Sequence, residues 1–269
     1  MLQQKLATAL AVWRHQGMEG ATRVSLEKAG MWWRRGEPFE LGKLVGRGSR
    51  HVRIDGCRFG LEDEAITPAL EHLLLTGKHE APERALIRQH LNPDLPIVEL
   101  GGALGVVSCI ANAMLRDPSR HVVVEPNPAL LPVLEANRLR NGSRFAIVHG
   151  ALAYGAPVVS FPVAADVLAS SARVTGARSV TVRATTLREL LRQHRFSRCN
   201  LVCDIEGTEL DLVREEAGVL ATAVEVLIME VHDRLVGTGP CAEMLRSLER
   251  LGFERVGQVW DTIAMRRRV

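Results

Sequence analysis

The sequence predicts an α/β fold: a doubly wound, mainly parallel sheet with helices on both faces, preceded by a smaller α+β region. From about residue 97, short apolar runs that are typical of buried strands alternate with segments of helical periodicity. Glycine- and proline-containing turns separate the two kinds of segment. This alternation is typical of sheets in which each helix connects two parallel strands.

The composition is that of an ordinary globular protein. The 269 residues include 34 Lys and Arg against 31 Asp and Glu, a formal net charge of +3, and 46% are hydrophobic. These values exclude a disordered or collagen-like chain. The basic run is confined to residues 266–268, so we expect no nucleic-acid partner. No apolar stretch reaches the ~18 residues of a membrane span, and residues 1–17 lack the order of a secretory signal.

The five cysteines are an odd number in a long chain. Cys199 and Cys203 are four residues apart, but no second Cys or His pair stands at metal-site spacing. We interpret the cysteines as buried thiols in a reducing compartment, which predicts a cytoplasmic protein.

The N-terminal region, residues 1–91, is expected to hold a helix, short strands and two further helices. Apolar residues recur at helical spacing over 2–16, which predicts an amphipathic helix that packs on the domain or pairs two subunits in a homo-oligomer. A short strand is predicted at 51–55. Helices are predicted at 68–76, after an N-cap threonine and a first-turn proline, and at 81–91.

The second region, residues 92–269, carries the alternating pattern. Buried strands are predicted at residues 97–100, 121–124, 145–148, 201–203 and 224–229. Helices are predicted at residues 104–115, 128–141, 186–194, 208–216 and 240–251, with a closing hairpin over 253–265. Residues 151–185 interrupt the alternation with two β-like runs. We expect this insertion at the rim of the sheet to form a wall of the substrate pocket, and the alternative is an edge hairpin without ligand contacts.

A glycine-rich turn after the first of these strands is the strongest local indication of a ligand. Open α/β sheets bind ligands at such strand ends, where glycines let the backbone come close to the ligand. The dinucleotide pattern G-x-G-x-x-G fails at Leu100, whereas acidic-x-G-x-x-x-G fits Glu99, Gly101 and Gly105. A carboxylate there repels phosphates and suits a cationic amino-acid moiety. Taken alone, the cluster is equally explained by a tight turn.

A second carboxylate ends the next strand. Glu125 follows Glu99 by 26 residues, about one β-α-β unit. A carboxylate at this place accepts hydrogen bonds from both hydroxyls of a ribose. The alternative is a capping role for the helix that Pro126-Asn127-Pro128 opens. Together, the two acidic strand ends favour S-adenosylmethionine (SAM) over a nicotinamide dinucleotide.

The chain resembles the FkbM family of SAM-dependent methyltransferases. Its glycine turn, Glu99-Leu100-Gly101-Gly102-Ala103-Leu104-Gly105, resembles the family's D-x-G-A-N-x-G. At the next strand end, Glu125-Pro126-Asn127-Pro128 resembles the family's E-P-x-P. In the helix after it, Leu134 and Asn137 resemble the family's L-x-x-N. Four further family motifs have matches: D-x-E-G-x-E at Asp204–Glu209, E-x-H at Glu230–His232, G-x-Y-E at Gly77–Glu80, and T-L-D at Thr186–Leu187. The matches span roughly residues 75–235 in order.

The resemblance implies a Rossmann-like SAM-methyltransferase fold that methylates a hydroxyl of a small-molecule or glycan acceptor: a sugar, a glycolipid or another natural product. The chain departs from the family pattern at Glu99, Ala103, Cys203, His79 and Arg188. Alanine in place of asparagine at 103 removes one side-chain partner near the methionine part of SAM. The alternatives are an N-methyltransferase with the same cofactor site and a non-catalytic protein of this fold that binds partners through its N-terminal helix.

The cofactor is expected to lie over the first two strand ends. Its predicted contacts are Glu80, Glu99, Gly101, Gly102, Gly105, Glu125, Pro126, Asn127, Gly150 and Ala151. The last two residues follow the third strand, where such folds meet the adenine edge.

Four polar residues at the ends of the fourth and fifth strands are expected to serve the acceptor. Asp204 and Glu206 share one strand face if the strand continues, and Glu230 and His232 repeat that spacing. A hydroxyl nucleophile needs a base, and His232 is the first choice because histidine titrates near neutrality. Asp204 is the second, as a base or by orienting the hydroxyl, and Glu206 and Glu230 are expected to bind substrate. We do not favour the alternative of a divalent metal on these acids and Asp233.

Overall fold

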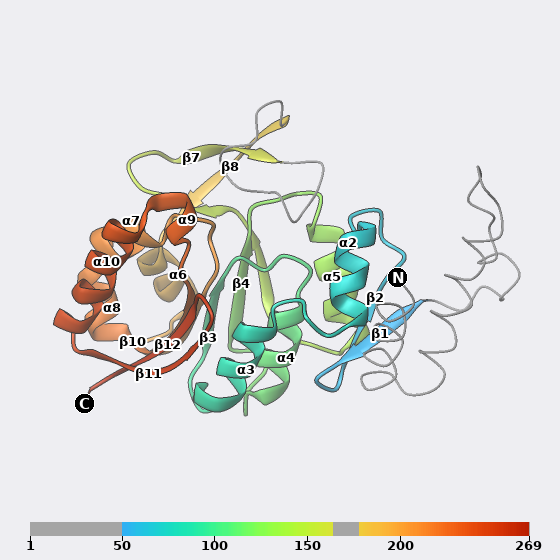
Figure 1. The fold of residues 1–269 in the computed structure, drawn as a ribbon, viewed down its shortest axis with the longest axis horizontal. Helices are drawn as coiled ribbons and strands as arrows, with labels where there is room; N and C mark the ends of the chain where they lie inside the picture. Colours follow the sequence, from blue (N-terminus) through green and yellow to red (C-terminus); the bar gives the residue numbers. More distant parts are fainter. Residues whose placement is uncertain (1–49, 164–177, 269) are drawn as a thin grey trace, which may run out of the picture. The chain divides into compact units, whose positions relative to one another are not determined.

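The computed structural model describes residues 50–163 and 178–268 (Figure 1). The chain divides into two units, Met1–His79 and Glu80–Val269. The helix predicted at residues 2–16 and most of the region up to residue 64 lie outside the described residues.

The described part of the first unit is a hairpin followed by a helix. Strands β1 (His51–Ile54) and β2 (Cys57–Gly60) pair antiparallel around a tight turn. Helix α2 (Pro68–Leu75) begins where the sequence predicted, because the Thr67 hydroxyl accepts a hydrogen bond from the Leu70 amide and Pro68 occupies the first turn. The predicted strand and helix are therefore confirmed.

The second unit is built on a seven-stranded sheet in the order β11-β12-β10-β9-β3-β4-β5. Its strands are β3 (Ile97–Leu100), β4 (His121–Glu125), β5 (Ala146–His149), β9 (Cys199–Cys203), β10 (Val224–Glu230), β11 (Phe253–Val259) and β12 (Thr262–Arg267). The first five strands named run parallel, and in the C-terminal hairpin β12 pairs antiparallel with both β10 and β11. The strand order reverses between β3 and β9, which confirms the doubly wound α/β sheet and places a topological switch point there.

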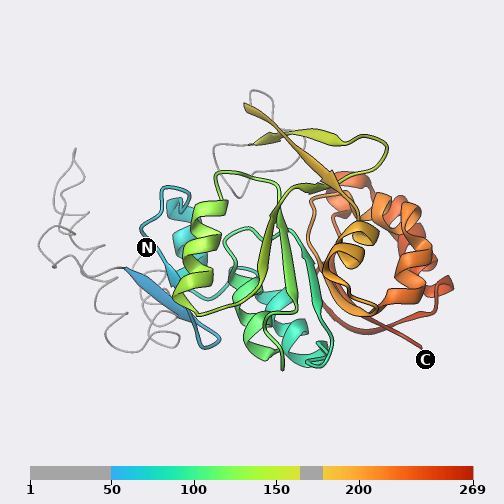
Figure 2. The same cartoon turned by 180° about the vertical axis from the view of Figure 1, so that it is seen from behind.

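Helices cover both faces of this sheet (Figures 1 and 2). One face carries α3 (Ala81–His90) and α4 (Val106–Met114), with α5 (Leu131–Arg140) beside α4. The other face carries α6 (Leu187–His194), α7 (Glu209–Glu215), α8 (Ala217–Ala223) and α10 (Thr238–Arg250), and the short α9 (Asp233–Val236) precedes α10. Strand β10 serves both cores, because alternate residues point to opposite faces: Ile228 packs with α3 and α4, and Leu227 packs with α7 and α8.

Helix α3 belongs to the second unit, although the sequence analysis placed it in the N-terminal region. Its Leu86 and Ile87 are fully buried in the same core as Ile97 of β3 and Val226 of β10. This packing brings the N-terminal end of α3 close to the ends of β10 and β12.

The insertion forms a second sheet of three strands in the order β6-β8-β7. Strands β7 (Val158–Val163) and β8 (Arg178–Thr185) pair antiparallel, as the two β-like runs predicted, and β6 (Ala151–Leu152) pairs in parallel with β8. Residues 164–177, between the two longer strands, lie outside the described residues. The role of the insertion as a wall of the substrate pocket stays a prediction.

Candidate active site

The glycine turn lies compressed between β9 and α5. A Cβ atom on Gly101 would lie 1.9 Å from the carbonyl oxygen of Asp204, and one on Gly105 would lie 2.6 Å from Cδ1 of Leu134. Both glycines have positive φ, at 93° and 78°. Side chains at these two positions are therefore excluded by strain and by contact, so that backbone alone forms the end of β3. Gly102 is equally confined, since its Cβ would lie 2.5 Å from a methyl group of Val123.

Helix α5 supports the turn through the L-x-x-N match. The buried Asn137 side chain donates to the carbonyl of Leu104 at 2.9 Å, and Leu134 packs against Gly105. Ala103, where the family has asparagine, adopts the left-handed conformation with φ of 41°. Asparagine tolerates this conformation better than alanine, so the substitution leaves a strained residue in the turn.

Glu125 connects the turn to the end of β4. Its side chain is buried, and its two carboxylate oxygens accept hydrogen bonds from the amides of Ala103 and Asn127, each at 2.7 Å. Burial raises the pKa of this carboxyl, and the amide donors partly offset the rise. A carboxylate has about four acceptor positions, so beside the amides of Asn127, Ala103 and Gly102 this group keeps acceptor capacity for a ribose hydroxyl. Asn127 caps its own turn by accepting from the Ala129 amide, and the Pro126 carbonyl lies 3.2 Å from Nε2 of His149.

The position of Glu99 does not support its predicted contact with the cofactor. Its side chain is fully buried and faces α4 rather than the strand end. One oxygen accepts from the Ser108 hydroxyl at 2.6 Å, and the other lies 2.9 Å from Nε2 of His121. Glu99 is therefore a structural residue beneath the glycine turn.

The remaining predicted cofactor contacts lie around the turn. Glu80, at the start of α3, accepts from the Val107 amide in the first turn of α4 at 3.2 Å. Burial, together with the charge of Glu83, raises its pKa well above the usual range. Gly150 follows β5 and lies directly against β8, since a Cβ there would be 2.9 Å from the Arg183 carbonyl oxygen. Ala151 is half-buried and pairs with Ala184 in β8.

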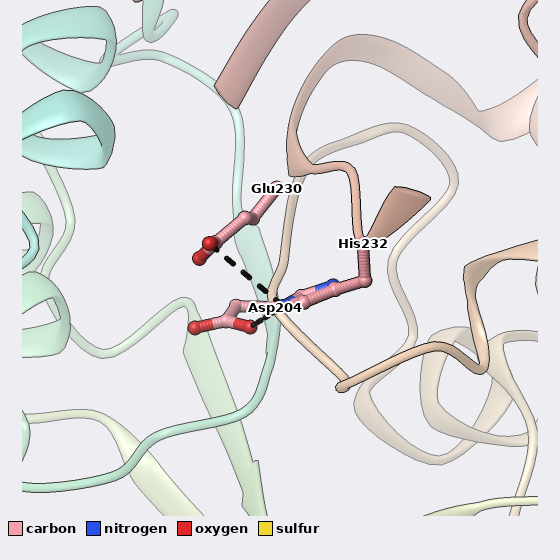
Figure 3. Close-up of side chains that lie close together, drawn as sticks. All are labelled: Asp204, Glu230 and His232. Atoms are coloured by element: carbon pink, nitrogen blue, oxygen red, sulfur yellow. Dashed lines mark ion pairs between the residues drawn. The ribbon is translucent and has the colours of Figure 1, made fainter. Parts of the chain in front are cut away.

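Four carboxyl groups and one imidazole gather beside the turn, at the ends of β9 and β10. We call Asp204, Glu206, Glu209, Glu230 and His232 the carboxylate–histidine cluster. The register of the two strands explains the gathering: Cys203, the last residue of β9, lies opposite Met229, so the next residues, Asp204 and Glu230, come at neighbouring places on the same edge of the sheet. Figure 3 shows the ring of His232 between the carboxyl groups of Asp204 and Glu230. The sequence-based prediction that Asp204, Glu206, Glu230 and His232 converge is confirmed.

Glu209 fixes the orientation of the His232 ring. Nδ1 of His232 lies 2.8 Å from Oε1 of Glu209, and the side chain of Glu209 is only 2% exposed. The same carboxylate oxygen accepts from the amide of Ile205 at 3.2 Å. Nε2 of His232 consequently points at the other three carboxyl groups, at 3.5 Å from Asp204, 3.6 Å from Glu206 and 3.8 Å from Glu230.

The negative charges alter the titration of the cluster. Burial alone would lower the pKa of His232, but the hydrogen bond to Glu209 and the nearby carboxylates raise it to about 9. This shift moves the pKa of His232 above the near-neutral range on which its choice as the base rested. Burial, together with the charge of Glu83, raises the pKa of Glu230 to about 7. Burial and the charge of Glu230 raise the pKa of Asp204 well above its usual range.

Two residues of this site, Glu209 and Glu83, were not predicted from the sequence. Glu209 is the last position of the D-x-E-G-x-E match and lies in the first turn of α7, two residues after Gly207. Its place in this motif could have marked it as a site residue. Glu83, buried in α3, accepts a hydrogen bond from the Thr262 hydroxyl at 2.6 Å. Its charge helps to raise the pKa of Glu230 in the cluster. No local pattern marks Glu83, because its place depends on how α3 packs against β10 and β12.

The chain matches one known protein family by sequence. The sequence model of the family described as "Methyltransferase FkbM domain" matches residues 99–255. No curated protein sequence matches the chain. No described helix combines the length and apolar character needed to cross a membrane.

Several solved structures share a distant likeness with the chain. A precorrin-6y C5,15-methyltransferase from Geobacter metallireducens is 14% identical, with 71% of this chain and 90% of that chain covered and a TM-score of 0.43. A ribosomal protein L11 methylase from Lactobacillus delbrueckii subsp. bulgaricus is 12% identical, with 71% and 80% covered and a TM-score of 0.42. Fibrillarin from Aeropyrum pernix, solved with natively bound SAM, is 18% identical, with 82% of each chain covered and a TM-score of 0.38.

Proposed function

The chain belongs to the FkbM family of methyltransferases, with SAM as its cofactor, and from this premise we propose that it methylates a hydroxyl group. The acceptor class we propose is a sugar, a glycolipid or another natural product that carries several hydroxyls. The observation that carries this proposal is the pairing of His232 with the buried Glu209, because it leaves Nε2 aimed at the neighbourhood of the glycine turn.

The cofactor and the acceptor have adjoining places in this proposal. SAM lies over the glycine turn, and Glu125 accepts hydrogen bonds from the ribose hydroxyls. Asp204 links the two places, since its carbonyl packs on Gly101 while its carboxyl group faces His232. SAM held over the glycine turn would have the carboxylate–histidine cluster as its neighbour, and the cluster would receive the acceptor.

The reaction is an in-line displacement at the sulfonium methyl carbon. The acceptor oxygen forms a bond to this carbon while the carbon–sulfur bond breaks. The electron pair of the broken bond stays on sulfur and gives S-adenosylhomocysteine. The hydroxyl proton passes to Nε2 of His232, because Glu209 holds the hydrogen on Nδ1. When bound, SAM would supply the electrophilic methyl group, and its positive charge near His232 would lower the pKa of the imidazole and favour the neutral ring that accepts a proton.

The other carboxyl groups orient the acceptor. Asp204, the half-buried Glu230 and the exposed Glu206 accept hydrogen bonds from the hydroxyls next to the reacting one, whose own proton faces His232. A polyhydroxylated ring offers several donors at the spacing of such carboxylates, which supports a sugar-like acceptor. An amine acceptor, once neutral, needs less help from a base, and N-methylation is therefore the second candidate.

The test is methyl transfer by the full chain with SAM and a panel of sugars, glycolipids and amines, followed as S-adenosylhomocysteine release and as the mass gain of the acceptor. We expect His232→Ala to lower turnover of a hydroxyl acceptor by about 10²- to 10⁴-fold, with SAM affinity measured by calorimetry nearly unchanged. His72→Ala, an exposed histidine in α2, is the matched control. Turnover restricted to amines, or insensitive to His232→Ala, would overturn O-methylation, and no SAM binding would favour the non-catalytic alternative.

A further inference from the structure

We propose that Asp204, Glu230 and His232 form a binding site for a divalent transition-metal ion. The role of the ion in catalysis rests on the proposed function, whereas the binding of the ion rests on the geometry of the cluster alone.

The three side chains are spaced as ligands of one ion. One atom from each, Nε2 of His232 and an oxygen of each carboxyl group, lies within 4.8 Å of the other two. Nε2 is 3.5 Å from Asp204 and 3.8 Å from Glu230, which is too long for a good hydrogen bond. Ligand atoms that surround a metal at roughly 2.0–2.2 Å stand about 3–4 Å apart. The two distances from Nε2, to Asp204 and to Glu230, fall in this range.

A buried atom of Asp204 provides a second and independent observation. Its Oδ1 is buried and has no hydrogen-bond partner among the described residues. This atom is the one that lies 3.5 Å from Nε2 of His232, so it points into the space between the three groups (Figure 3). A buried carboxylate oxygen without a donor is costly, and a bound cation satisfies it.

Glu209 completes the arrangement as a positioning residue. Histidines that bind metals commonly donate their other ring N–H to a carboxylate, which fixes the tautomer and directs the free nitrogen to the ion. Glu209 holds Nδ1 of His232 in this way from a site that is 2% exposed. Glu206, at 3.6 Å from Nε2 and exposed to solvent, stands at the open side of the site.

The ligand set indicates the kind of ion. One imidazole and two carboxyl groups suit manganese, iron, cobalt or zinc, whereas magnesium and calcium prefer oxygen ligands alone. Three protein ligands leave open positions, and an acceptor hydroxyl that binds there has its pKa lowered by the ion. In the loaded site His232 is thus a ligand, and the hydroxyl loses its proton to water. Asp233, which the sequence offered as a further ligand, is exposed and is not part of the group.

The test uses the full chain, freed of metal with EDTA, and titrates it with Mn²⁺ alone. Calorimetry and the loss of the free Mn²⁺ signal in electron paramagnetic resonance are expected to show one ion per chain. Asp204→Asn and His232→Ala should each weaken binding by at least about tenfold, and Glu209→Gln by about 10- to 100-fold. Glu249→Gln, an exposed carboxylate in α10, should leave it unchanged. Circular dichroism identifies folded variants, and Glu230→Gln replaces any that fails.

Absence of Mn²⁺ uptake, or uptake that is the same in Asp204→Asn, Glu230→Gln and the wild type, would overturn the metal site. Because no SAM or acceptor is present, failure of the proposed methyl transfer leaves this result unaffected. Conversely, methyl transfer that continues at full rate in EDTA would retain the proposed function with His232 as base and overturn the catalytic role of the ion.

Discussion

At the scale of single residues, the function of His232 depends on which of its two nitrogens is engaged. Glu209 is buried, and its carboxyl group occupies Nδ1. Nε2 therefore serves either as a proton acceptor or as a metal ligand, and these two roles are mutually exclusive in one molecule. The surrounding carboxyl groups favour any cation at this position, a proton or a metal ion, because their negative charges are close together in a partly buried site.

The raised pKa of Glu230 predicts that the protein becomes less stable as the pH rises. In the unfolded chain its carboxyl group titrates near 4.5, and in the folded protein near 7. The folded state thus binds more protons between these values, so the free energy of unfolding decreases as pH rises through this window. Glu230→Gln removes this decrease, and we expect the variant to gain about 1–3 kcal/mol relative to wild type between pH 5 and pH 8.

Urea unfolding in EDTA at the two pH values measures this difference. Glu249→Gln, which removes an exposed carboxyl group from α10, should show no such gain. A difference between Glu230→Gln and wild type that is the same at both pH values would contradict the assignment.

At the scale of elements, the glycine turn predicts an unusually costly substitution. Gly101→Ala places a Cβ 1.9 Å from the Asp204 carbonyl oxygen, at a φ of 93°. We expect a loss of about 2–4 kcal/mol in unfolding free energy, and weaker SAM binding in calorimetry, since β3 and β9 must separate. Gly142→Ala is the matched control, because Gly142 also has positive φ but has no atom within 4 Å of its Cβ. Its cost should stay near 1 kcal/mol, and equal costs for both variants would show that the close contact is unimportant.

Element boundaries differ from the sequence prediction where side chains compete with helix geometry. Helix α5 begins at Leu131 rather than Pro128, because the Asn127 side chain caps a turn through the Ala129 amide. Helix α7 ends at Glu215, and an unpredicted helix, α8, follows. Between them Glu216 turns inward to accept hydrogen bonds from the first amides of α6. Such interactions join distant segments and leave no mark on local periodicity.

At the scale of the whole molecule, the sequence predicted which residues lie at the strand ends, but it did not predict which of their side chains are buried. Alternating strands and helices fix which residues reach the C-terminal edge of a parallel sheet, and Asp204, Glu230 and His232 met there as expected. Glu99 was misassigned because spacing does not reveal which face of β3 it occupies, and that face is closed by α4. Glu83 was not predicted from the sequence, because α3 joins the sheet only through tertiary packing.

The bond between Glu83 and Thr262 offers a test of this long-range packing. The Thr262 hydroxyl donates to Oε1 of Glu83 at 2.6 Å, and the pair joins α3 to the C-terminal hairpin across 179 residues of sequence. Thr262→Val keeps the shape but leaves a buried carboxyl group without this donor, which should lower the unfolding free energy by about 1–3 kcal/mol. Thr222→Val, which removes an exposed hydroxyl bonded within its own helix, should cost less than about 0.5 kcal/mol.

A double-mutant cycle decides whether the two residues act as a pair. If the bond joins α3 to the hairpin, the combined loss in Thr262→Val with Glu83→Gln should fall short of the sum of the single losses by about 0.5–3 kcal/mol. Additive losses would mean that Glu83 is held by other groups. In that case the charge that Glu83 adds beside Glu230 would be set by the core around α3 and not by its bond to the hairpin.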